Sequence, residues 1–345
     1  MVKLFSISGR RRRSDGPAAD GPRKLCVITG GTSGIGRGVV TRLLGGWPDH
    51  RIIVVARPSP RVDQLRELPG ACERLSVVYG DLASLRSIEK ACDQIKGMVG
   101  SDRVDVVALN AGVQVVRGNA SSVDGLELSF AVNFLAHFLI VERLKALVRP
   151  GGRIIITSSE VHDPDAFCLM GIGRATWQDP YLLADVERSQ DHIASLVDRG
   201  EARYCASKLL NLMYVRQLAR ALPDIGVLAF NPSVVPGTDI GRDRNWLQQL
   251  GWKYVMPLLA PLLPGARSLN TSVSDLLWLM TKADARSLSG HYVDGRVAQP
   301  GSAESNDEAK ITRAVEVAHA LLATILVPVK PSQPSLDHLP TLPAG

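Results

Sequence analysis

Two residues four positions apart, Tyr204 and Lys208, have side chains suited to acid–base chemistry. The surrounding stretch, 203–221, is predicted to be helical, and residues i and i+4 of a helix lie on the same face. A free phenol has a pKa of about 10, and a neighbouring cation lowers that pKa because it stabilises the phenolate. The pair therefore predicts a general acid–base catalyst that exchanges a proton with a substrate oxygen.

A glycine-rich turn, 29–36, lies between a short apolar segment and a helical one. Glycine permits a tight turn and lets the backbone approach a pyrophosphate closely. The helix N-terminus that follows presents unpaired N–H groups to phosphate oxygens. Between a strand and a helix, this pattern predicts a dinucleotide site. Its candidate contacts are Gly30, Thr32, Ser33, Gly34, Ile35 and Gly36.

The end of the second predicted strand indicates which dinucleotide binds. A carboxylate there would bind the ribose 2′-hydroxyl, whereas an arginine can bind a 2′-phosphate through a charge-assisted hydrogen bond. The sequence reads Ala56-Arg57-Pro58, with no carboxylate. Arg57 therefore favours NADP(H) over NAD(H).

Short apolar, β-branched segments alternate with helical ones from residue 24 onward. Continuous apolar runs indicate strands buried on both faces. The alternation predicts an α/β fold with a Rossmann-like, doubly wound parallel sheet in a single domain, 24–325. The predicted strands are 25–29, 51–56, 75–79, 104–109, 153–157 and 226–230, and the predicted helices are a segment from the glycine-rich turn to 44, then 84–98, 121–148 and 203–221.

Three segments fall outside this alternation. Residues 160–202 form a long loop insertion after the fifth strand. Residues 238–270 contain Trp246, Trp252 and Tyr254, which are expected to form an apolar lid, with core packing or contact with a membrane surface as alternatives. Residues 303–325 predict an extra C-terminal amphipathic helix, with a capping box formed by Ser305 and Glu308.

The net charge of +6 is concentrated at one end of the chain, because seven basic and two acidic residues lie among the first 24. Residues 1–23 are predicted to be a disordered basic leader, and the proline-rich residues 326–345 a disordered tail. The rest of the chain is nearly neutral and only 5% of all residues are aromatic, so no nucleic-acid partner is expected. Contact of the leader with an anionic membrane or a nucleic acid is the alternative.

Cysteine and histidine usage argue against disulfides and metals. The five cysteines are scattered without a C-x-x-C pair, which is typical of a reducing compartment and favours a cytoplasmic location. The seven histidines have no metal-ligand spacing, so no metal site is predicted. No apolar run is long enough to span a bilayer.

The glycine-rich turn T-G-x-x-x-G-I-G together with Tyr204-x-x-x-Lys208 resembles the short-chain dehydrogenase/reductase family over about residues 24–325. Segments 131–138 and 289–292 resemble its retinol dehydrogenase and protochlorophyllide reductase branch. The resemblance implies that Tyr204 is the general acid–base, Ser159 orients the carbonyl, and Asn133 and Lys208 support a proton relay. It also implies cofactor contacts from Tyr204, Lys208, Asp81, Leu82, Asn110, Ala111, Gly112, Val235 and Thr238.

The chain departs from the family pattern in three places. Ser159 and Tyr204 are separated by 45 residues, a long interval for the family. Pro232-Ser233 stands where a Pro-Gly pair is usual, in the loop that contributes Val235 and Thr238. Ser33 replaces a basic residue of the glycine-rich turn, so the NADP preference depends on Arg57.

These features predict an NADPH-dependent carbonyl reductase that transfers hydride to a ketone or aldehyde of a bulky hydrophobic substrate. Two alternatives remain open: an NAD-dependent alcohol dehydrogenase working in the oxidative direction, and a non-catalytic NADP-binding regulator. The expected partner is a small carbonyl or alcohol substrate. Formation of a homo-oligomer and contact with a membrane are left open by the sequence.

Overall fold

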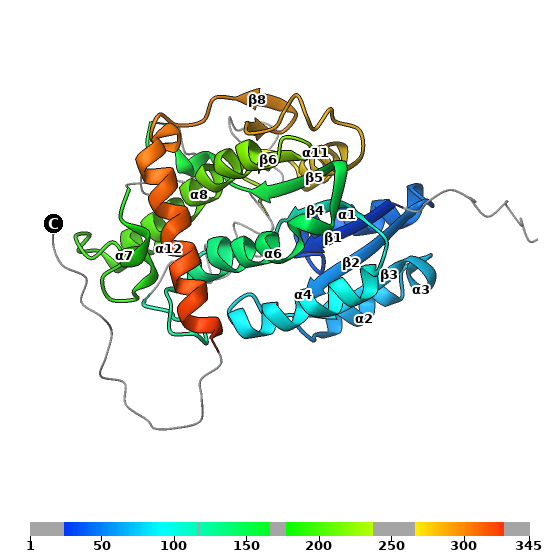
Figure 1. Cartoon of the computed structure of the whole chain (residues 1–345), viewed down its shortest axis with the longest axis horizontal. Coiled ribbons are helices and arrows are strands. Elements are labelled where there is room, and N and C mark those ends of the chain that lie inside the picture. The colour runs from blue at the N-terminus through cyan, green and yellow to red at the C-terminus, as the bar shows by residue number, and fades with distance from the viewer. Residues whose placement is uncertain (1–23, 116–117, 166–176, 237–265, 328–345) are drawn as a thin grey trace, which may run out of the picture.

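The computed structural model describes residues 24–115, 118–165, 177–236 and 266–327. Among these residues, eight strands form one sheet in the order β3-β2-β1-β4-β5-β6-β7-β8 (Figure 1). Strands β1 to β7 pair in parallel and β8 pairs antiparallel with β7, which confirms the predicted doubly wound sheet. The strands are β1 (Lys24–Thr29), β2 (His50–Ala56), β3 (Leu75–Tyr79), β4 (Val104–Leu109), β5 (Val148–Thr157), β6 (Gly226–Asn231), β7 (Tyr292–Asp294) and β8 (Val297–Gln299).

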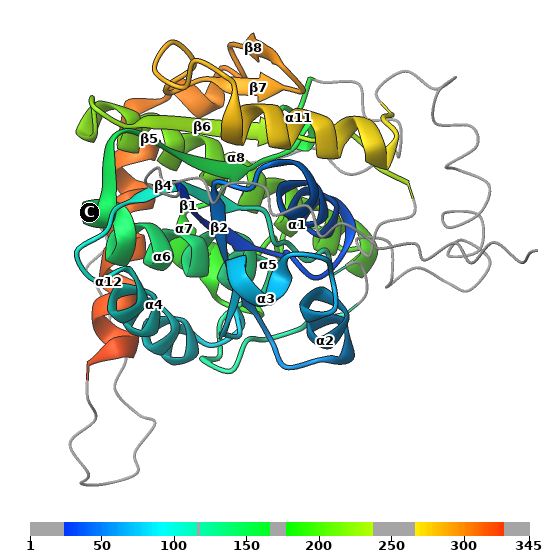
Figure 2. The same cartoon turned by 90° about the vertical axis from the view of Figure 1, so that its right-hand side faces the viewer.

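Helices cover both faces of the sheet (Figure 2). On one face, α1 (Gly34–Gly46) packs beside α11 (Leu269–Thr281). The other face carries α4 (Leu85–Val99), α6 (Ala136–Leu144) and α8 (Leu196–Ala221), and α12 (Glu308–Leu326) packs outside α8 and α4. The shorter helices are α2 (Pro60–Arg66), α3 (Ala71–Arg74), α5 (Leu128–Phe130) and α7 (Pro180–Ala184).

The core consists of two hydrophobic layers separated by the sheet. Strands β4 and β6 are buried along their whole length, as expected for parallel strands covered on both faces. Phe134 is fully buried between helices and its ring contacts Phe130, Phe138 and Tyr214. This aromatic cluster fixes α6 against α8, and both helices carry residues of the candidate site.

The predicted helix 121–148 begins later than expected. Ser121 instead bridges to Glu127, and the Ser122 hydroxyl accepts a hydrogen bond from the Leu126 N–H in a turn that includes Gly125. Serine side chains that bind nearby backbone compete with helix formation. The helical residues are α5, a π-helical turn η1 (Ala131–Leu135), α6 and a short 3-10 turn η2 (Lys145–Leu147), after which β5 begins at Val148.

Helix α8 begins seven residues before the predicted start at 203, so it takes in the end of the predicted insertion 160–202. Its N-cap is Ser195, whose hydroxyl accepts the Asp198 N–H. Several elements were not predicted, among them α11, which begins after the capping residue Ser268, and the short strands β7 and β8. Strands of three residues carry too little periodicity to be recognised in a sequence.

The C-terminal helix α12 is confirmed, but the predicted capping box is wrong. Ser305 lies in a separate 3-10 turn η7 (Glu304–Asn306), where its hydroxyl donates to the Ser302 carbonyl. The cap of α12 is Asp307, whose carboxylate accepts the N–H groups of Ala309 and Lys310. An acidic cap also interacts favourably with the positive end of the helix dipole.

Several predicted segments lie outside the described residues. These are the leader 1–23, nearly all of the tail 326–345, most of the lid 238–270 with its Trp246, Trp252 and Tyr254, and part of the insertion 160–202. Among the described residues, no helix is long and apolar enough to cross a membrane, and no group of three or more histidine, cysteine or acidic side chains is placed to hold a metal ion.

Removing the cap of α12 is expected to destabilise the protein. Asp307→Ala leaves two N–H groups of the first turn without a side-chain acceptor, and loss of an N-cap costs about 1 kcal/mol. Urea unfolding measures this cost as a lower midpoint. Asp307→Asn retains a capping oxygen and serves as the control. Equal midpoints for Asp307→Ala and the wild type would show that α12 does not depend on Asp307.

Candidate active site

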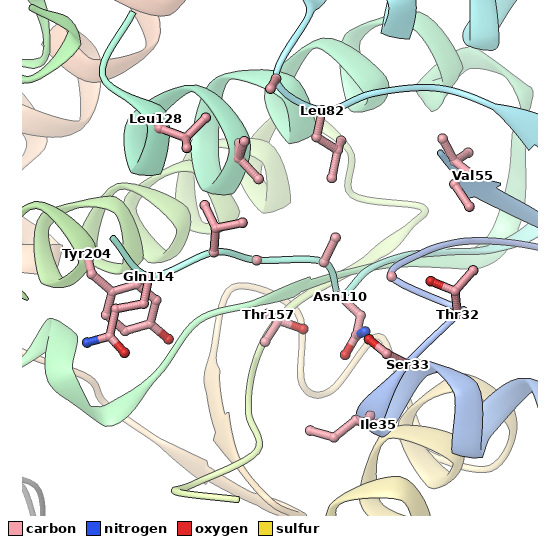
Figure 3. Close-up of a pocket in the computed structure, with 18 of the residues that line it drawn as sticks. Thr32, Ser33, Ile35, Val55, Leu82, Asn110, Gln114, Leu128, Thr157 and Tyr204 are labelled. Atoms are coloured by element: carbon pink, nitrogen blue, oxygen red, sulfur yellow. The ribbon is translucent and has the colours of Figure 1, made fainter. Parts of the chain in front are cut away.

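A cavity of about 780 Å³ opens at the carboxyl ends of the parallel strands (Figure 3). Its walls are the loops after β1, β2, β3, β4, β5 and β6, together with one face of α8. Strands β1 and β4 are neighbours at the centre of the sheet, where the strand order reverses. Open α/β sheets bind ligands at this switch point, and the volume suits a small-molecule ligand.

The glycine-rich turn after β1 forms a close-fitting backbone cradle. Gly30 and Gly34 have φ angles of +71° and +51°, which favour glycine. A Cβ on Gly36 would overlap the Gly30 carbonyl and lie 2.8 Å from Nδ2 of Asn110. Ser33 caps α1 without a side-chain hydrogen bond, so the first turn offers its N–H groups to a ligand. These residues fit the pyrophosphate of a dinucleotide.

The loops after β2 and β3 line the same cavity. Arg57 is exposed at the end of β2, and Arg61 lines the wall four residues further on. After β3, Asp81 accepts the Ala83 N–H and Leu82 lies beside it in the wall. The structure therefore places Arg57, Asp81 and Leu82 in one wall of the cavity, although the sequence pattern did not single out Arg61.

A buried hydrogen-bonded chain joins the ends of β1 and β4 to α6. The Ala111 N–H donates to Oγ1 of Thr29, and that hydroxyl contacts Nε2 of His137 at 3.1 Å. His137 Nδ1 lies 3.1 Å from the Asn133 carbonyl, so it carries the proton and Nε2 accepts from Thr29. Burial, reinforced by the charge of Lys208, lowers the pKa of His137 to about 3. The imidazole of His137 is therefore neutral near neutral pH.

Asn133 holds the loop after β4 against α8. It lies in η1, where the wider turn contains residues 131–135. Its Oδ1 accepts the Val113 N–H, and its Nδ2 donates to the Val113 carbonyl and to Oγ of Ser207. A Cβ on Gly112 would lie 3.4 Å from Oδ1 of Asn133 and 3.6 Å from Nζ of Lys208. Asn133 is thus adjacent to the lysine, and its side chain is engaged with backbone.

Tyr204 and Lys208 lie on the cavity side of α8. The Lys208 ammonium is 5.4 Å from the centre of the Tyr204 ring and donates to the Thr157 carbonyl at 3.0 Å. Both side chains are buried, and burial lowers the pKa of Lys208 to about 8. The helical spacing therefore brings together the two groups that the sequence selected, with the cation next to the phenol.

The two serines after β5 have different surroundings. The Ser158 hydroxyl is buried and donates to the Lys208 carbonyl at 2.8 Å, which ties α8 to β5. Ser159 is partly exposed, lines the cavity and precedes the 3-10 turn η3 (Glu160–His162). Of the two serines, Ser159 is therefore better placed to bind a ligand oxygen in the cavity.

The loop after β6 keeps a glycine-like conformation although it lacks the glycine. Ser233 has a φ of +60°, and its N–H donates to Oδ1 of Asn231. Asn231 Nδ2 in turn donates to Glu160 and to Asp294, and Arg267 pairs with Asp294. Val235 is buried in the cavity wall, whereas Thr238 lies outside the described residues.

Two further polar residues, Glu160 and Gln114, line the cavity wall, and of these only Gln114 was missed by sequence reasoning. Glu160 is largely buried and burial raises its pKa, while its bond with Asn231 acts in the opposite direction. Its position directly after Ser159 was the available signal. Gln114 follows the N-A-G segment by two residues, and nothing in its local sequence distinguishes it from a surface glutamine.

The fold and the cavity define a dinucleotide-binding α/β protein with a tyrosine–lysine pair beside the nucleotide cradle. The protein-family model described as short chain dehydrogenase matches residues 24–166. A WW domain-containing oxidoreductase of Drosophila melanogaster is 30% identical over 276 residues, covering 78% of this chain and 61% of the relative. Retinol dehydrogenase 14 of the mouse is 30% identical over 236 residues, covering 64% of this chain and 63% of the relative.

Among solved structures, a short-chain dehydrogenase/reductase of Brucella melitensis has a TM-score of 0.57 at 18% identity, over 79% of this chain and 95% of that one. The chain belongs to the short-chain dehydrogenase/reductase family of NAD(P)-dependent oxidoreductases. Retinol dehydrogenases are among its relatives, as the resemblance predicted. The chain spans less than two thirds of the length of the Drosophila and mouse relatives.

Neutralising Glu160 is expected to change how stability depends on pH. Because burial raises the pKa of Glu160 in the folded state, the protonated form stabilises the wild type at acid pH, and this contribution is lost as pH rises through the folded pKa. Glutamine does not ionise, so Glu160→Gln does not lose this stability as pH rises. The melting temperature of Glu160→Gln minus that of the wild type is therefore expected to increase from about pH 4.5 towards pH 8.

The control is Glu67→Gln, at an exposed glutamate of the surface. Its difference from the wild type is expected to stay flat over the same range. A Glu160→Gln difference that is constant or that shrinks with rising pH would contradict the assignment of a buried, reluctantly ionised carboxyl.

Proposed function

We propose that the protein is an NADPH-dependent carbonyl reductase that converts a ketone or aldehyde to an alcohol. The observation that carries this proposal is the buried ammonium of Lys208 beside the Tyr204 ring, in a cavity that also contains the glycine cradle. A regulator that only senses a nucleotide has no need of a buried cation beside a phenol. Membership of an oxidoreductase family and the retinol dehydrogenases among the relatives support the same reading.

Different residues of the cavity bind the cofactor, orient the substrate and transfer the proton. The N–H groups of the first turn of α1 bind the pyrophosphate, and Asp81, Leu82 and Asn110 to Gly112 line the path of the rest of the dinucleotide. When bound, the nicotinamide supplies the hydride. Ser159 donates a hydrogen bond to the substrate carbonyl, and Tyr204 delivers the proton to its oxygen. The positive charge of Lys208 stabilises the phenolate that remains.

Asn133 acts through the backbone in this scheme. Its side chain fixes Val113 and Ser207, so it holds the loop after β4 and α8 at a constant separation. The adjacent Lys208 then keeps its place between the Thr157 carbonyl and Tyr204. We assign Asn133 to positioning the relay between Tyr204 and Lys208.

The choice of NADP(H) is supported by the basic residues after β2. Arg57 and Arg61 both line the cavity there, and the acidic residues of the wall, within the described part of the chain, are Asp81 and Glu160. Asp81 follows β3, and its carboxylate accepts the Ala83 N–H. We infer the reductive direction from this preference, since cells hold NADP mostly in its reduced form, and a cytoplasmic location from the sparse, odd set of cysteines.

Replacing the phenol is expected to abolish turnover without abolishing cofactor binding. Tyr204→Phe removes the proton donor, and loss of a general acid–base costs about 100-fold or more in kcat/KM. Reduction of a panel of ketones and aldehydes is followed by NADPH absorbance, and NADPH affinity by fluorescence titration. Tyr181→Phe, the same change at an exposed tyrosine, is the control. Near-wild-type turnover by Tyr204→Phe would refute the mechanism.

Removing the arginine at the end of β2 is expected to change cofactor preference. Arg57→Ala loses a charge-assisted bond to the 2′-phosphate, so the ratio of kcat/KM for NADPH over NADH is expected to fall about 10-fold. Arg66→Ala, at an exposed arginine that lies outside the cavity wall, is the control. An unchanged ratio in Arg57→Ala, or a wild-type preference for NADH, would favour the oxidative NAD-dependent alternative.

A further inference from the structure

Gln114 is a buried side chain of the cavity wall with no hydrogen-bond partner for either end of its carboxamide. The residue is 5% exposed, and both Oε1 and Nε2 are inaccessible to solvent. Within the described part of the chain, it is the only buried side chain with two polar atoms that both lack a hydrogen-bond partner. This combination is unusual enough to require an explanation.

Buried polar groups in folded proteins are nearly always hydrogen-bonded. A carboxamide offers two N–H donors and a carbonyl acceptor, and leaving it unpaired in a low-dielectric interior is unfavourable. An apolar residue of similar size would fill the same space without that cost. The unpaired carboxamide therefore indicates a partner that comes from outside the chain. Such a partner can come from the cavity that Gln114 lines, and it reaches the carboxamide when the side chain turns from its position in the free protein, where both polar atoms are closed to solvent.

The backbone around Gln114 is rigidly held at the reactive end of the cavity. Asn133 binds both the N–H and the carbonyl of Val113, the preceding residue. Asn133 also binds Ser207, whose hydroxyl donates to the Tyr204 carbonyl. Figure 3 draws Gln114 and Tyr204 at the same end of the cavity, opposite Thr32 and Val55 at the nucleotide end. A group that contacts Gln114 therefore belongs to the substrate rather than to the phosphates.

Apolar side chains also line the cavity: Val113, Leu128, Val132, Val161 and Val235. A single unpaired carboxamide among such residues discriminates strongly between ligands. A site built to hydrogen-bond a polar group rejects an analogue that lacks the group far more effectively than an apolar pocket rejects an additional group.

We propose that Gln114 is a specificity-determining residue that binds a second oxygen function of the substrate. This inference rests on the proposed carbonyl reductase function and narrows its substrate class. The preferred substrate is a ketone or aldehyde that carries a hydroxyl or a second carbonyl close to the reacting carbon. A hydroxyl satisfies both ends of the carboxamide, because it accepts from Nε2 and donates to Oε1, while Ser159 and Tyr204 bind the reacting oxygen.

The test uses Gln114→Met, which retains the length of the side chain and removes both hydrogen-bonding atoms. The substrates are 2-hydroxyacetophenone and acetophenone, which differ by one hydroxyl. The wild type is expected to favour the hydroxyketone in kcat/KM, and Gln114→Met to lower that ratio by about 10-fold or more. The intrinsic reactivity of each ketone cancels in this comparison. Gln64→Met, at an exposed glutamine, is the control.

A second measurement does not require turnover. Because the carboxamide is unpaired in the free protein, Gln114→Met is expected to raise the melting temperature by about 2 °C or more. A glutamine with a structural role would give the opposite sign. A lowered melting temperature in both Gln114→Met and Gln114→Leu would show that the carboxamide has a partner in the fold and would overturn the inference.

The remaining outcomes distinguish the role of Gln114 from the proposed carbonyl reductase function. If wild type and Gln114→Met both reduce the ketones with the same ratio, the role of Gln114 is wrong and the proposed function stands. If the wild type reduces neither ketone nor any carbonyl of the wider panel, the proposed function fails and this inference fails with it.

Discussion

The hydrogen bonds between α8 and the end of β5 are the contact on which the site depends. Lys208 and Asn211 both donate to the Thr157 carbonyl, and Ser158 donates back to the Lys208 carbonyl. These groups are buried, so each bond is made in a low-dielectric environment and loss of one partner would leave an unpaired polar atom. Because α8 carries Tyr204, this contact sets the position of the phenol relative to the edge of the sheet where the nucleotide cradle lies.

The same contact explains why a lysine can be buried here. Its burial lowers the pKa of Lys208 to about 8, which leaves the ammonium mostly protonated near neutral pH. The carbonyl of Thr157 compensates part of the lost hydration, and the face of the Tyr204 ring lies 5.4 Å away. Burying a cation at this place is unfavourable for folding. A buried cation beside a phenol that lines a cavity is an arrangement typical of functional sites. Stability and reactivity are thus coupled through one side chain.

The sequence was sufficient for the parts of the fold that depend on short-range patterns. Continuous apolar strands, the glycine-rich turn and the i, i+4 spacing of Tyr204 and Lys208 are local, and each was found where it was expected. Other features were not accessible because their local signal is ambiguous or too short. Ser305 and Asp307 are both suitable cap residues, Ser195 begins α8 ahead of the predicted range, and β7 has only three residues. Gln114 shows the limit most clearly, because only the folded structure reveals a buried carboxamide without a partner.

The neutral His137 makes the stability of the region around the nucleotide cradle sensitive to acid. The unfolded chain binds a proton on this imidazole at about pH 6.5, whereas the folded protein resists doing so until about pH 3. Acidification therefore draws the equilibrium towards the unfolded chain through a residue that contacts Thr29 at the base of the cradle. Strand β1 and helix α6 are thus joined through a ring whose neutral form the folded protein favours.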